Sequence, residues 1–218
     1  MQFYNLLSYL FPLTVRRSTS PYNREISVLV ENGKYTLYVN GSPQSGPYVQ
    51  RLWQKALHGV HITPSLPTNS ILVLGVAGGT VVRLLQQLFP KAVTVGVDID
   101  QVMVEIGKQY FGLSETTRLK VFLQDALAFV RSVGEKRISY DLIISDLFSG
   151  REIPRFVASE EFLIILKHLL TPHGSIIINF LREHEYRRRS ERLSAKLEKI
   201  FPFVESRELS NNRFFWVR

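Results

Sequence analysis

From residue 71 onward, short and mainly apolar runs alternate with segments whose apolar residues recur at helical spacing. Apolar strands separated by helices are typical of a parallel sheet that is covered on both faces. Strands are predicted at Ile71–Gly75, Val93–Val97, Leu119–Leu123, Leu142–Ser145 and Ser175–Asn179, and helices near Thr80–Leu88, Gln101–Tyr110, Ala126–Val133 and Glu160–Leu170. Two last runs, Phe203–Glu208 and Arg213–Val217, are joined by Ser-Asn-Asn and predict a closing antiparallel hairpin.

The chain before residue 71 has a different pattern. Two β-type runs, Glu25–Val30 and Tyr35–Val39, flank Asn32-Gly33, which is a strong hairpin signal. Tyr48–Leu57 is predicted to be a helix, and His61–Asn69 is a proline-rich link. We therefore expect a small β-hairpin and helix appendage over residues 21–66. It precedes a doubly wound Rossmann-like α/β domain over 67–218, which is mostly parallel with a C-terminal antiparallel hairpin.

The N-terminal segment, residues 1–20, carries an apolar stripe at helical spacing that Pro12 ends. Its members are Phe3, Leu6, Leu7, Leu10 and Phe11. The stripe is too short to span a bilayer and has neither a basic leader nor a small-residue cleavage site. We expect a helix that docks on the body of the protein or on a second subunit, as in a homodimer. Interfacial membrane binding, helped by Arg16 and Arg17, is a minority alternative.

The composition is that of an ordinary globular protein, with 218 residues, 45% hydrophobic and 21% charged. Cysteine is absent, which excludes a disulfide framework, a thiolate nucleophile and a cysteine-based zinc site, and suits a reducing cytoplasm. The five histidines form no metal-binding motif, so no metal site is expected. We expect a cytoplasmic protein.

The formal net charge of +8 raises the question of an anionic partner. Part of the excess lies in the run from Arg182 to Arg192, where Glu183/Arg187 and Glu185/Arg189 have i, i+4 spacing. That spacing predicts ion pairs on a solvated helix face. No aromatic residues interleave with the arginines as in a stacking platform for single strands, so the sequence gives nucleic acid no positive support.

The segment Ile71–Thr80 is a buried strand followed by a glycine turn that contains Gly75, Gly78 and Gly79. Asp98 ends the next strand, 19 residues after Gly79, and a carboxylate near this spacing can hold ribose hydroxyls. The turn is not a strict G-x-G-x-x-G, so a dinucleotide site is one interpretation. A tight strand-to-helix turn without any ligand is the alternative.

Carboxylates also follow the third and fourth strands, at Asp125 and Asp146. Ligands of open α/β sheets bind at the carboxyl ends of the strands. An isolated aspartate there is often only a helix cap, and Asp125 could simply cap the helix that begins at Ala126. Three successive strand-end carboxylates beside a glycine turn predict a pocket for a nucleoside with a polar tail.

These segments resemble the class I S-adenosylmethionine-dependent methyltransferases, most closely their spermidine synthase-like branch. Val93–Phe111 is similar to the second-strand signature of that branch, and Tyr140–Asp146 is similar to the fourth-strand signature. The hairpin with Asn40–Gln44 resembles the β appendage that precedes a spermidine synthase core. The likeness covers roughly Pro21 to the C-terminus.

The resemblance implies S-adenosylmethionine, or its decarboxylated form, as cofactor, and it implies roles for the strand-end residues. Asp98 would hold the ribose, Asp125 would accept from the adenine amino group, and Ala126 would offer its backbone N–H. Asp146 would lie beside the sulfonium as a base or orienting carboxylate. The remaining cofactor contacts would be Gln44, from the appendage, and Gly75, Gly78 and Gly79, near the methionine part.

Departures from spermidine synthases guide the choice of reaction. Those enzymes carry acids where this chain has Gly78 and Ser149, and a glutamate and a tyrosine where it has Lys55 and Trp53. A polyamine is a polycation, and burying it needs several carboxylates. The expected acceptor wall consists instead of Trp53, Gln54, Phe148 and Ser149, together with Tyr48 and Leu147; ordinary packing is the alternative for Trp53 and Phe148.

The sequence therefore predicts an S-adenosylmethionine-dependent transferase that moves a methyl group to an unidentified, small-molecule acceptor. Polyamine aminopropyl transfer, as in spermidine synthase, is the alternative within enzymes. A non-catalytic protein that keeps the fold and binds a nucleoside or a partner is the alternative outside them. Retention of all three strand-end carboxylates argues against a fully degenerate site.

Overall fold

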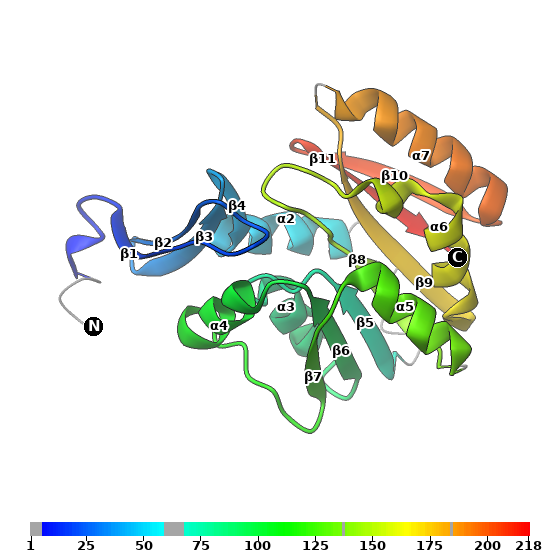
Figure 1. The fold of residues 1–218 in the computed structure, drawn as a ribbon, viewed down its shortest axis with the longest axis horizontal. Coiled ribbons are helices and arrows are strands. Elements are labelled where there is room, and N and C mark those ends of the chain that lie inside the picture. Colours follow the sequence, from blue (N-terminus) through cyan, green and yellow to red (C-terminus); the bar gives the residue numbers. More distant parts are fainter. Residues whose placement is uncertain (1–5, 59–67, 137, 184) are drawn as a thin grey trace.

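The computed structural model describes residues 6–58, 68–136, 138–183 and 185–218. Its main feature is a seven-stranded sheet in the order β10-β11-β9-β8-β5-β6-β7 (Figure 1). The strands are β5 (Ser70–Leu74), β6 (Val93–Asp98), β7 (Leu119–Leu123), β8 (Tyr140–Ser145), β9 (Leu170–Leu181), β10 (Val204–Leu209) and β11 (Asn212–Val217). β11 pairs antiparallel with both of its neighbours, and the other pairs are parallel. The predicted fold class is confirmed.

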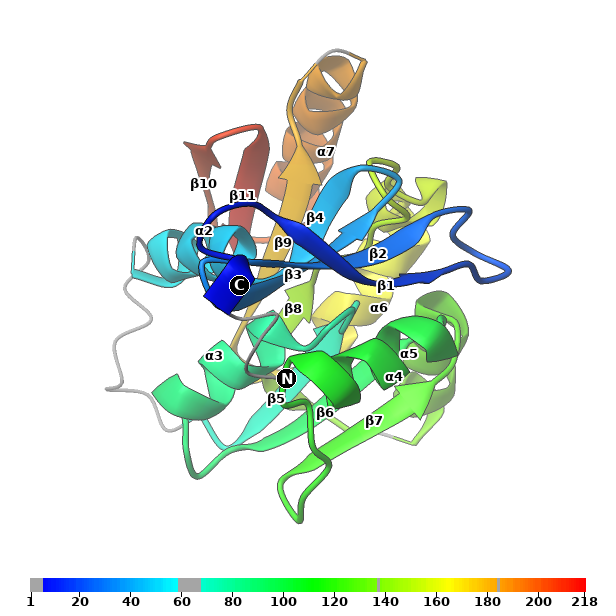
Figure 2. The ribbon, with the colours of Figure 1, turned by 90° about the vertical axis from the view of Figure 1, so that its left-hand side faces the viewer.

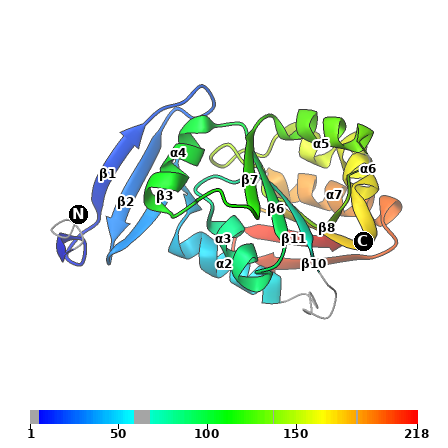
Figure 3. The ribbon, with the colours of Figure 1, turned by 90° about the horizontal axis from the view of Figure 1, so that it is seen from below.

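Helices cover both faces of this sheet (Figure 3). Side chains alternate along β5, so Leu72 and Leu74 pack toward the side of α5, α6 and α7, whereas Ile71 and Val73 pack toward α2 and α3. The helices are α2 (Pro47–His58), α3 (Thr80–Leu88), α4 (Gln101–Tyr110), α5 (Ala126–Glu135), α6 (Glu160–His168) and α7 (Tyr186–Ile200), with a short 3-10 helix η1 (Arg155–Ala158). Burial on both faces explains why the core strands are apolar throughout rather than alternating.

The appendage is a second sheet, antiparallel and four-stranded, in the order β1-β2-β3-β4. It contains β1 (Leu13–Ser18), β2 (Ile26–Glu31), β3 (Lys34–Val39) and β4 (Ser42–Ser45). The predicted hairpin is β2–β3, and both residues of its turn, Asn32 and Gly33, have positive φ, as the turn requires. The two edge strands were not predicted, because β4 contains Pro43 and β1 contains two arginines, features that weaken a strand signal without excluding an edge strand.

The small sheet packs against α4 of the core (Figure 2). Ile26, Val28 and Leu37 from the appendage meet Met103 and Ile106 of α4 in one buried cluster. The turn from β4 into α2 then carries the chain back across the core, so the appendage stands beside the carboxyl ends of the core strands (Figure 1).

The described part of the N-terminal stripe is largely unpacked in the single chain, and docking on a second subunit, the other predicted role, stays a prediction. Leu6, Leu10 and Phe11 are exposed rather than packed on the body, and Leu10 has 78% of its surface exposed. The segment is tied to the appendage by polar contacts instead, since the Oγ of Ser8 accepts from the N–H of Gly33 at 2.9 Å. Phe3 and most of the proline-rich link lie outside the described residues. No described helix is both long and apolar enough to cross a membrane.

The ion pairs predicted for the arginine-rich run are wrong. Helix α7 begins at Tyr186, so Glu183 lies outside it; Glu185 is its N-cap, and among the described residues it forms no ion pair with Arg189. Glu183 pairs with Arg151 at 3.2 Å, and the Arg189 guanidinium lies over the Tyr186 ring at 4.7 Å.

Candidate active site

The carboxyl ends of β5, β6, β7 and β8 surround a cavity of about 280 Å³, which we call the strand-end cavity. The three carboxylates that the sequence placed at successive strand ends, Asp98, Asp125 and Asp146, all line it. Six other predicted site residues line it as well: Gln44, Gly75, Ala126, Leu147, Phe148 and Ser149. The parallel topology is the cause, because it brings the carboxyl ends of these strands to one edge of the sheet.

Gly75 directly follows β5, at a position where a side chain would clash with the backbone. Its φ is +91°, and a Cβ atom would lie 2.1 Å from the backbone oxygen of Asp146. The absence of a side chain lets the ends of β5 and β8 approach each other at the cavity wall.

The other two glycines of the turn do not line the strand-end cavity. Gly78 donates its backbone N–H to the Oγ of Ser45 at 3.0 Å, and a Cβ there would lie 2.8 Å from that side chain. Gly79 has a φ of +84° and faces the side chain of Leu113. These glycines let the appendage and Leu113 pack against the turn. An aspartate at position 78, as in spermidine synthases, would require Ser45 to move.

Asp98 holds the glycine turn in place from the end of β6. Its carboxylate accepts backbone N–H groups from Val76 at 3.0 Å, Ala77 at 2.7 Å and Asp100 at 2.9 Å. Burial raises the pKa of Asp98, and these hydrogen bonds oppose that rise. The carboxylate therefore fixes the cavity wall as well as facing the cavity.

Asp125 is the N-cap of α5, where its side chain accepts from the N–H of Ala128 at 2.8 Å. The capping role offered as an alternative from the sequence is thus present. The two roles are compatible, because Asp125 and the buried Ala126 both line the strand-end cavity.

Asp146 follows β8 and is held by two donors from different elements. The indole N–H of Trp53, on α2, donates to its Oδ2 at 3.0 Å, and the amide of Asn179, on β9, donates to its Oδ1 at 2.8 Å. Desolvation raises the pKa of Asp146 to about 6, although both hydrogen bonds favour the carboxylate. The group is therefore an ionised, oriented carboxylate at neutral pH that takes up a proton in the mildly acidic range.

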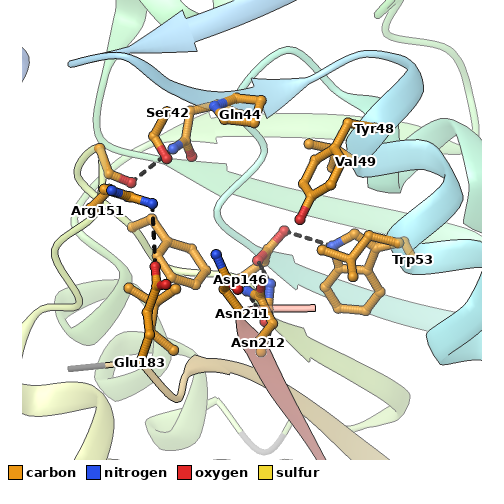
Figure 4. Close-up of a pocket in the computed structure, with 16 residues that line it drawn as sticks. Ser42, Gln44, Tyr48, Val49, Trp53, Asp146, Arg151, Glu183, Asn211 and Asn212 are labelled. Carbon is orange, nitrogen blue, oxygen red and sulfur yellow. Dashed lines mark hydrogen bonds and ion pairs between the residues drawn. The ribbon is translucent and has the colours of Figure 1, made fainter. Parts of the chain in front are cut away.

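A second cavity of about 220 Å³, the appendage cavity, opens between the appendage and the core (Figure 4). It shares Gln44, Asp146, Phe148 and Gly150 with the strand-end cavity. The other main lining residues are Tyr48 and Trp53 from α2, Arg151, Glu183, and the amide side chains of Asn179, Asn211 and Asn212. Asp146 thus lies where the two cavities meet.

The predicted acceptor residues divide between this junction and the surface. Trp53 and Phe148 line the appendage cavity, and Trp53 also packs edge-on against Phe214 at 5.1 Å, so its packing role and its site role coexist. Ser149 lines the strand-end cavity only. Gln54 lies outside both cavities, because one residue along a helix turns the side chain by about 100° away from Trp53.

Residues of the appendage, in β4 and in the loop before β2, hold the segment that follows Asp146. The Gln44 side chain donates to the Gly150 carbonyl at 2.8 Å, and the Ser149 hydroxyl donates to the Tyr22 carbonyl at 3.2 Å. Asn23, which also lines the strand-end cavity, donates to the buried Asp100 at 2.7 Å.

Several of these residues were not predicted from the sequence. Asn179 could have been found, because it is a polar residue at the end of a predicted apolar strand, as Asp146 is. Asn211 and Asn212 were assigned to a hairpin turn, and nothing in their local pattern points to a cavity. Asn23 and Asp100 meet across 77 residues of chain, which no local pattern records.

Replacing Asp98 by alanine is expected to weaken adenosyl-ligand binding by about tenfold to a hundredfold, because two N–H groups of the glycine turn and that of Asp100 lose their acceptor, and the ligand loses one as well. Isothermal titration measures this. Asp141→Ala is the matched control: Asp141 accepts from Asn69 and Ser70 at the opposite end of β8, away from either cavity. Unchanged affinity in Asp98→Ala, or an equal loss in both variants, contradicts the placement of the ligand.

The fold and the cavities together define a class. A doubly wound sheet of this order, with carboxylates and a glycine turn around a cavity at its carboxyl edge, belongs to a Rossmann-like α/β protein built for a nucleoside-type ligand. The model of the spermine/spermidine synthase domain matches residues 54–208, and the chain belongs to that family.

Relatives of the chain include proteins with two different activities. The chain is 33% identical over 150 residues to the human eEF1A lysine and N-terminal methyltransferase, a match covering 64% of this chain and 21% of that protein. It is 32% identical over 133 residues to a polyamine aminopropyltransferase of Vibrio vulnificus, covering 61% and 42%. The chain thus spans less than half of the length of either relative.

Two solved structures are also similar to the chain. Human methyltransferase-like protein 13 in complex with SAH has a TM-score of 0.65 at 27% identity, covering 78% of this chain and 80% of that one. Spermidine synthase from Thermotoga maritima has a TM-score of 0.74 at 12% identity, covering 94% and 72%, and shares the fold.

Proposed function

We propose that the protein is an S-adenosylmethionine-dependent methyltransferase, with the cofactor in the strand-end cavity and the acceptor in the appendage cavity. The observation that carries the proposal is the position of Asp146, a desolvated carboxylate at the junction of the two cavities. A transfer between two bound molecules needs their reacting atoms close together, and a junction of two cavities supplies that arrangement.

The charge of the side chains that line the strand-end cavity suits this cofactor. Asp98, Asp125 and Asp146 are carboxylates, Asp100 adds a fourth, and no lysine or arginine is among the described residues that line the cavity. Such a lining favours a cationic ligand such as a sulfonium compound. Asp98 is placed for ribose hydroxyls, and the start of α5 at Ala126 offers backbone N–H groups near a base.

The cofactor supplies a carbon bonded to a sulfonium sulfur, and the residues of this chain orient the acceptor toward that carbon. Trp53 and Asn179 fix the Asp146 carboxylate from opposite sides. Its free lone pairs can hold an N–H or O–H of the acceptor and receive the proton that the acceptor releases. Phe148 and the fastened segment from Ser149 to Arg151 limit the access of water.

The charge of the appendage cavity favours methyl transfer over aminopropyl transfer. Its two carboxylates are Asp146 and Glu183, and Glu183 is already paired with Arg151 at 3.2 Å. A polyamine would therefore find one uncompensated acid for at least two positive charges, which leaves a desolvated cation without a partner. Two of the similar human proteins, the eEF1A lysine and N-terminal methyltransferase and methyltransferase-like protein 13, support the same choice.

Aminopropyl transfer is the second candidate, favoured by the family to which the chain belongs and by the Vibrio vulnificus relative. For this reaction the Arg151–Glu183 pair would have to open so that Glu183 could face the amine.

Product analysis separates the candidates. We expect S-adenosylmethionine and S-adenosylhomocysteine to bind in isothermal titration, and acceptor-dependent turnover to release S-adenosylhomocysteine. Incubation with decarboxylated S-adenosylmethionine and putrescine should release no methylthioadenosine. Release of methylthioadenosine contradicts the preference for methyl transfer. If S-adenosylmethionine, S-adenosylhomocysteine and methylthioadenosine all fail to bind in isothermal titration, both reactions are contradicted. A non-catalytic protein with this fold then remains.

A further inference from the structure

A group of basic side chains lies on the outer face of α2, next to the appendage cavity. Arg51, Lys55 and His58 from α2 and Arg207 from β10 surround a shallow depression of about 470 Å³, with Gln54 between them. We call these five residues the α2–β10 surface. Gln54, expected from the sequence to contact the acceptor, therefore lies here.

The cations of the α2–β10 surface are not neutralised within the described part of the chain. Arg51, Lys55 and Arg207 are exposed, and none forms an ion pair with a described acid. Glu205 shares the face of β10 that carries Arg207, but it does not line the depression. Some other exposed cations do have acidic partners, such as Arg131 with Glu161.

The α2–β10 surface continues from the mouth of the appendage cavity. Tyr48 lines that cavity and donates its hydroxyl to Ser210, in the turn between β10 and β11, at 3.1 Å. Arg51, Lys55 and His58 follow Tyr48 along one side of α2 at spacings of three, four and three residues. A helix rises about 1.5 Å per residue, so this row extends about 15 Å from the cavity.

The size and chemistry of the surface indicate an extended acidic polypeptide. A row about 15 Å long exceeds a small acceptor and matches about five residues of extended chain. Exposed cations that have no acidic partner attract carboxylates and steer an acidic ligand as it approaches. Among the described residues, no aromatic side chain lines the depression, and single-stranded nucleic acids are normally bound by aromatic stacking as well as by charge.

We propose that the α2–β10 surface binds an acidic segment of a protein acceptor, whose target group enters the appendage cavity beside Asp146. The assignment of that segment to an acceptor rests on the proposed function. Binding of the acidic segment itself does not.

Fluorescence anisotropy with labelled peptides tests the docking surface. The probes are a short peptide of alternating glutamate and glycine, the same peptide with glutamine, and an oligothymidylate of similar length. We expect the glutamate peptide to bind most tightly, with an affinity that falls as the salt concentration rises. The triple variant Arg51→Glu, Lys55→Glu, Arg207→Glu should weaken it about tenfold or more, because like charges then face each other.

The matched control reverses three other exposed lysines, Lys91, Lys120 and Lys136, which have no described ion pair and line neither cavity. Lys120 lies on β7, the edge strand opposite β10. This control carries the same net charge and should change peptide affinity less than about twofold. Equal losses in both variants would show attraction by net charge alone and overturn the proposal. Tighter binding of oligothymidylate, lost in the first variant, would replace the polypeptide with a nucleic acid and also overturn it.

Titration of both triple variants with S-adenosylmethionine separates this inference from the proposed function and reports correct folding. If the ligand binds wild type and both variants but no acidic peptide binds, the docking surface is refuted and the transferase stands. If the peptide binds as expected and no adenosyl compound does, the transferase is refuted and the docking surface stands.

Discussion

Replacing Asp146 by asparagine is expected to lower the rate of transfer at saturating substrate by about a thousandfold while leaving the affinity for S-adenosylmethionine within a few-fold of wild type. The substitution keeps the size of the side chain but removes its charge and its capacity to accept a proton. One of the two donors, Trp53 or Asn179, also loses its acceptor and faces an amide N–H₂ instead. Single-turnover kinetics combined with calorimetric titration of the cofactor measure the two effects separately.

Asp141→Asn is the matched control, because Asp141 also accepts several hydrogen bonds but lies at the amino end of the same strand. Its transfer rate should stay close to wild type. A fully active Asp146→Asn variant, or equal losses in both variants, would refute the role of Asp146 as base or orienting carboxylate.

The protonation state of Asp146 is also expected to determine how the transfer rate depends on pH. Burial raises the pKa of Asp146 to about 6, and the carboxylate form is the active base, so the wild-type rate should fall as the pH drops through about 6.

Stability should change in the opposite direction. The folded state binds this proton more tightly than the unfolded chain does, so Asp146 makes the free energy of unfolding fall, by up to about 3 kcal/mol, as the pH rises from about 4 to 6. Asp146→Asn should remove this part of the pH dependence in denaturant titrations. The same slope in the variant would show that Asp146 is not the group responsible.

Gly75→Ala is expected to have the largest structural effect, lowering the free energy of unfolding by about 3 kcal/mol or more and abolishing adenosyl-ligand binding. A methyl group at this position would have both an unfavourable φ of +91° and a contact of 2.1 Å with the backbone oxygen of Asp146. Relief of that contact requires the end of β5 to move away from β8, which displaces the catalytic carboxylate and opens the cavity wall.

Alanine variants of two other glycines separate the effect of the unfavourable φ from that of the steric contact. Gly112→Ala introduces the strain alone, since φ is +67° and a Cβ would meet nothing within 4 Å; we expect a loss of about 1 kcal/mol. Gly134→Ala lies in α5 with neither strain nor a nearby atom, and it should be neutral or stabilising by up to about 1 kcal/mol. Chemical denaturation gives all three values. If Gly75→Ala is no less stable than Gly112→Ala, the steric contact between the ends of β5 and β8 adds nothing to the loss of stability.

The local pattern of this sequence was sufficient to predict the elements of the core. Helices α3 and α4 begin and end where the apolar spacing placed them, and the hairpin β2–β3 forms around Asn32-Gly33 as expected. These features depend on contacts between residues close in sequence, or on a turn that only certain residues adopt. The edge strand β4 was missed, because Pro43 hides it from a propensity argument while costing little at an unpaired edge.

The residue pattern also predicted which functional groups lie at the strand ends. Parallel pairing brings all carboxyl ends to one edge, so Asp98, Asp125 and Asp146 had to converge once the strands were recognised. Three relations depend on how the chain packs in space: Asp146 is shared by two cavities, Asn179 and Trp53 hold it, and Gln54 and its basic neighbours face outward beside the cavity mouth. Those relations join residues as far apart as 93 positions through the packing of the appendage on the core, and such packing leaves no periodic trace in the chain.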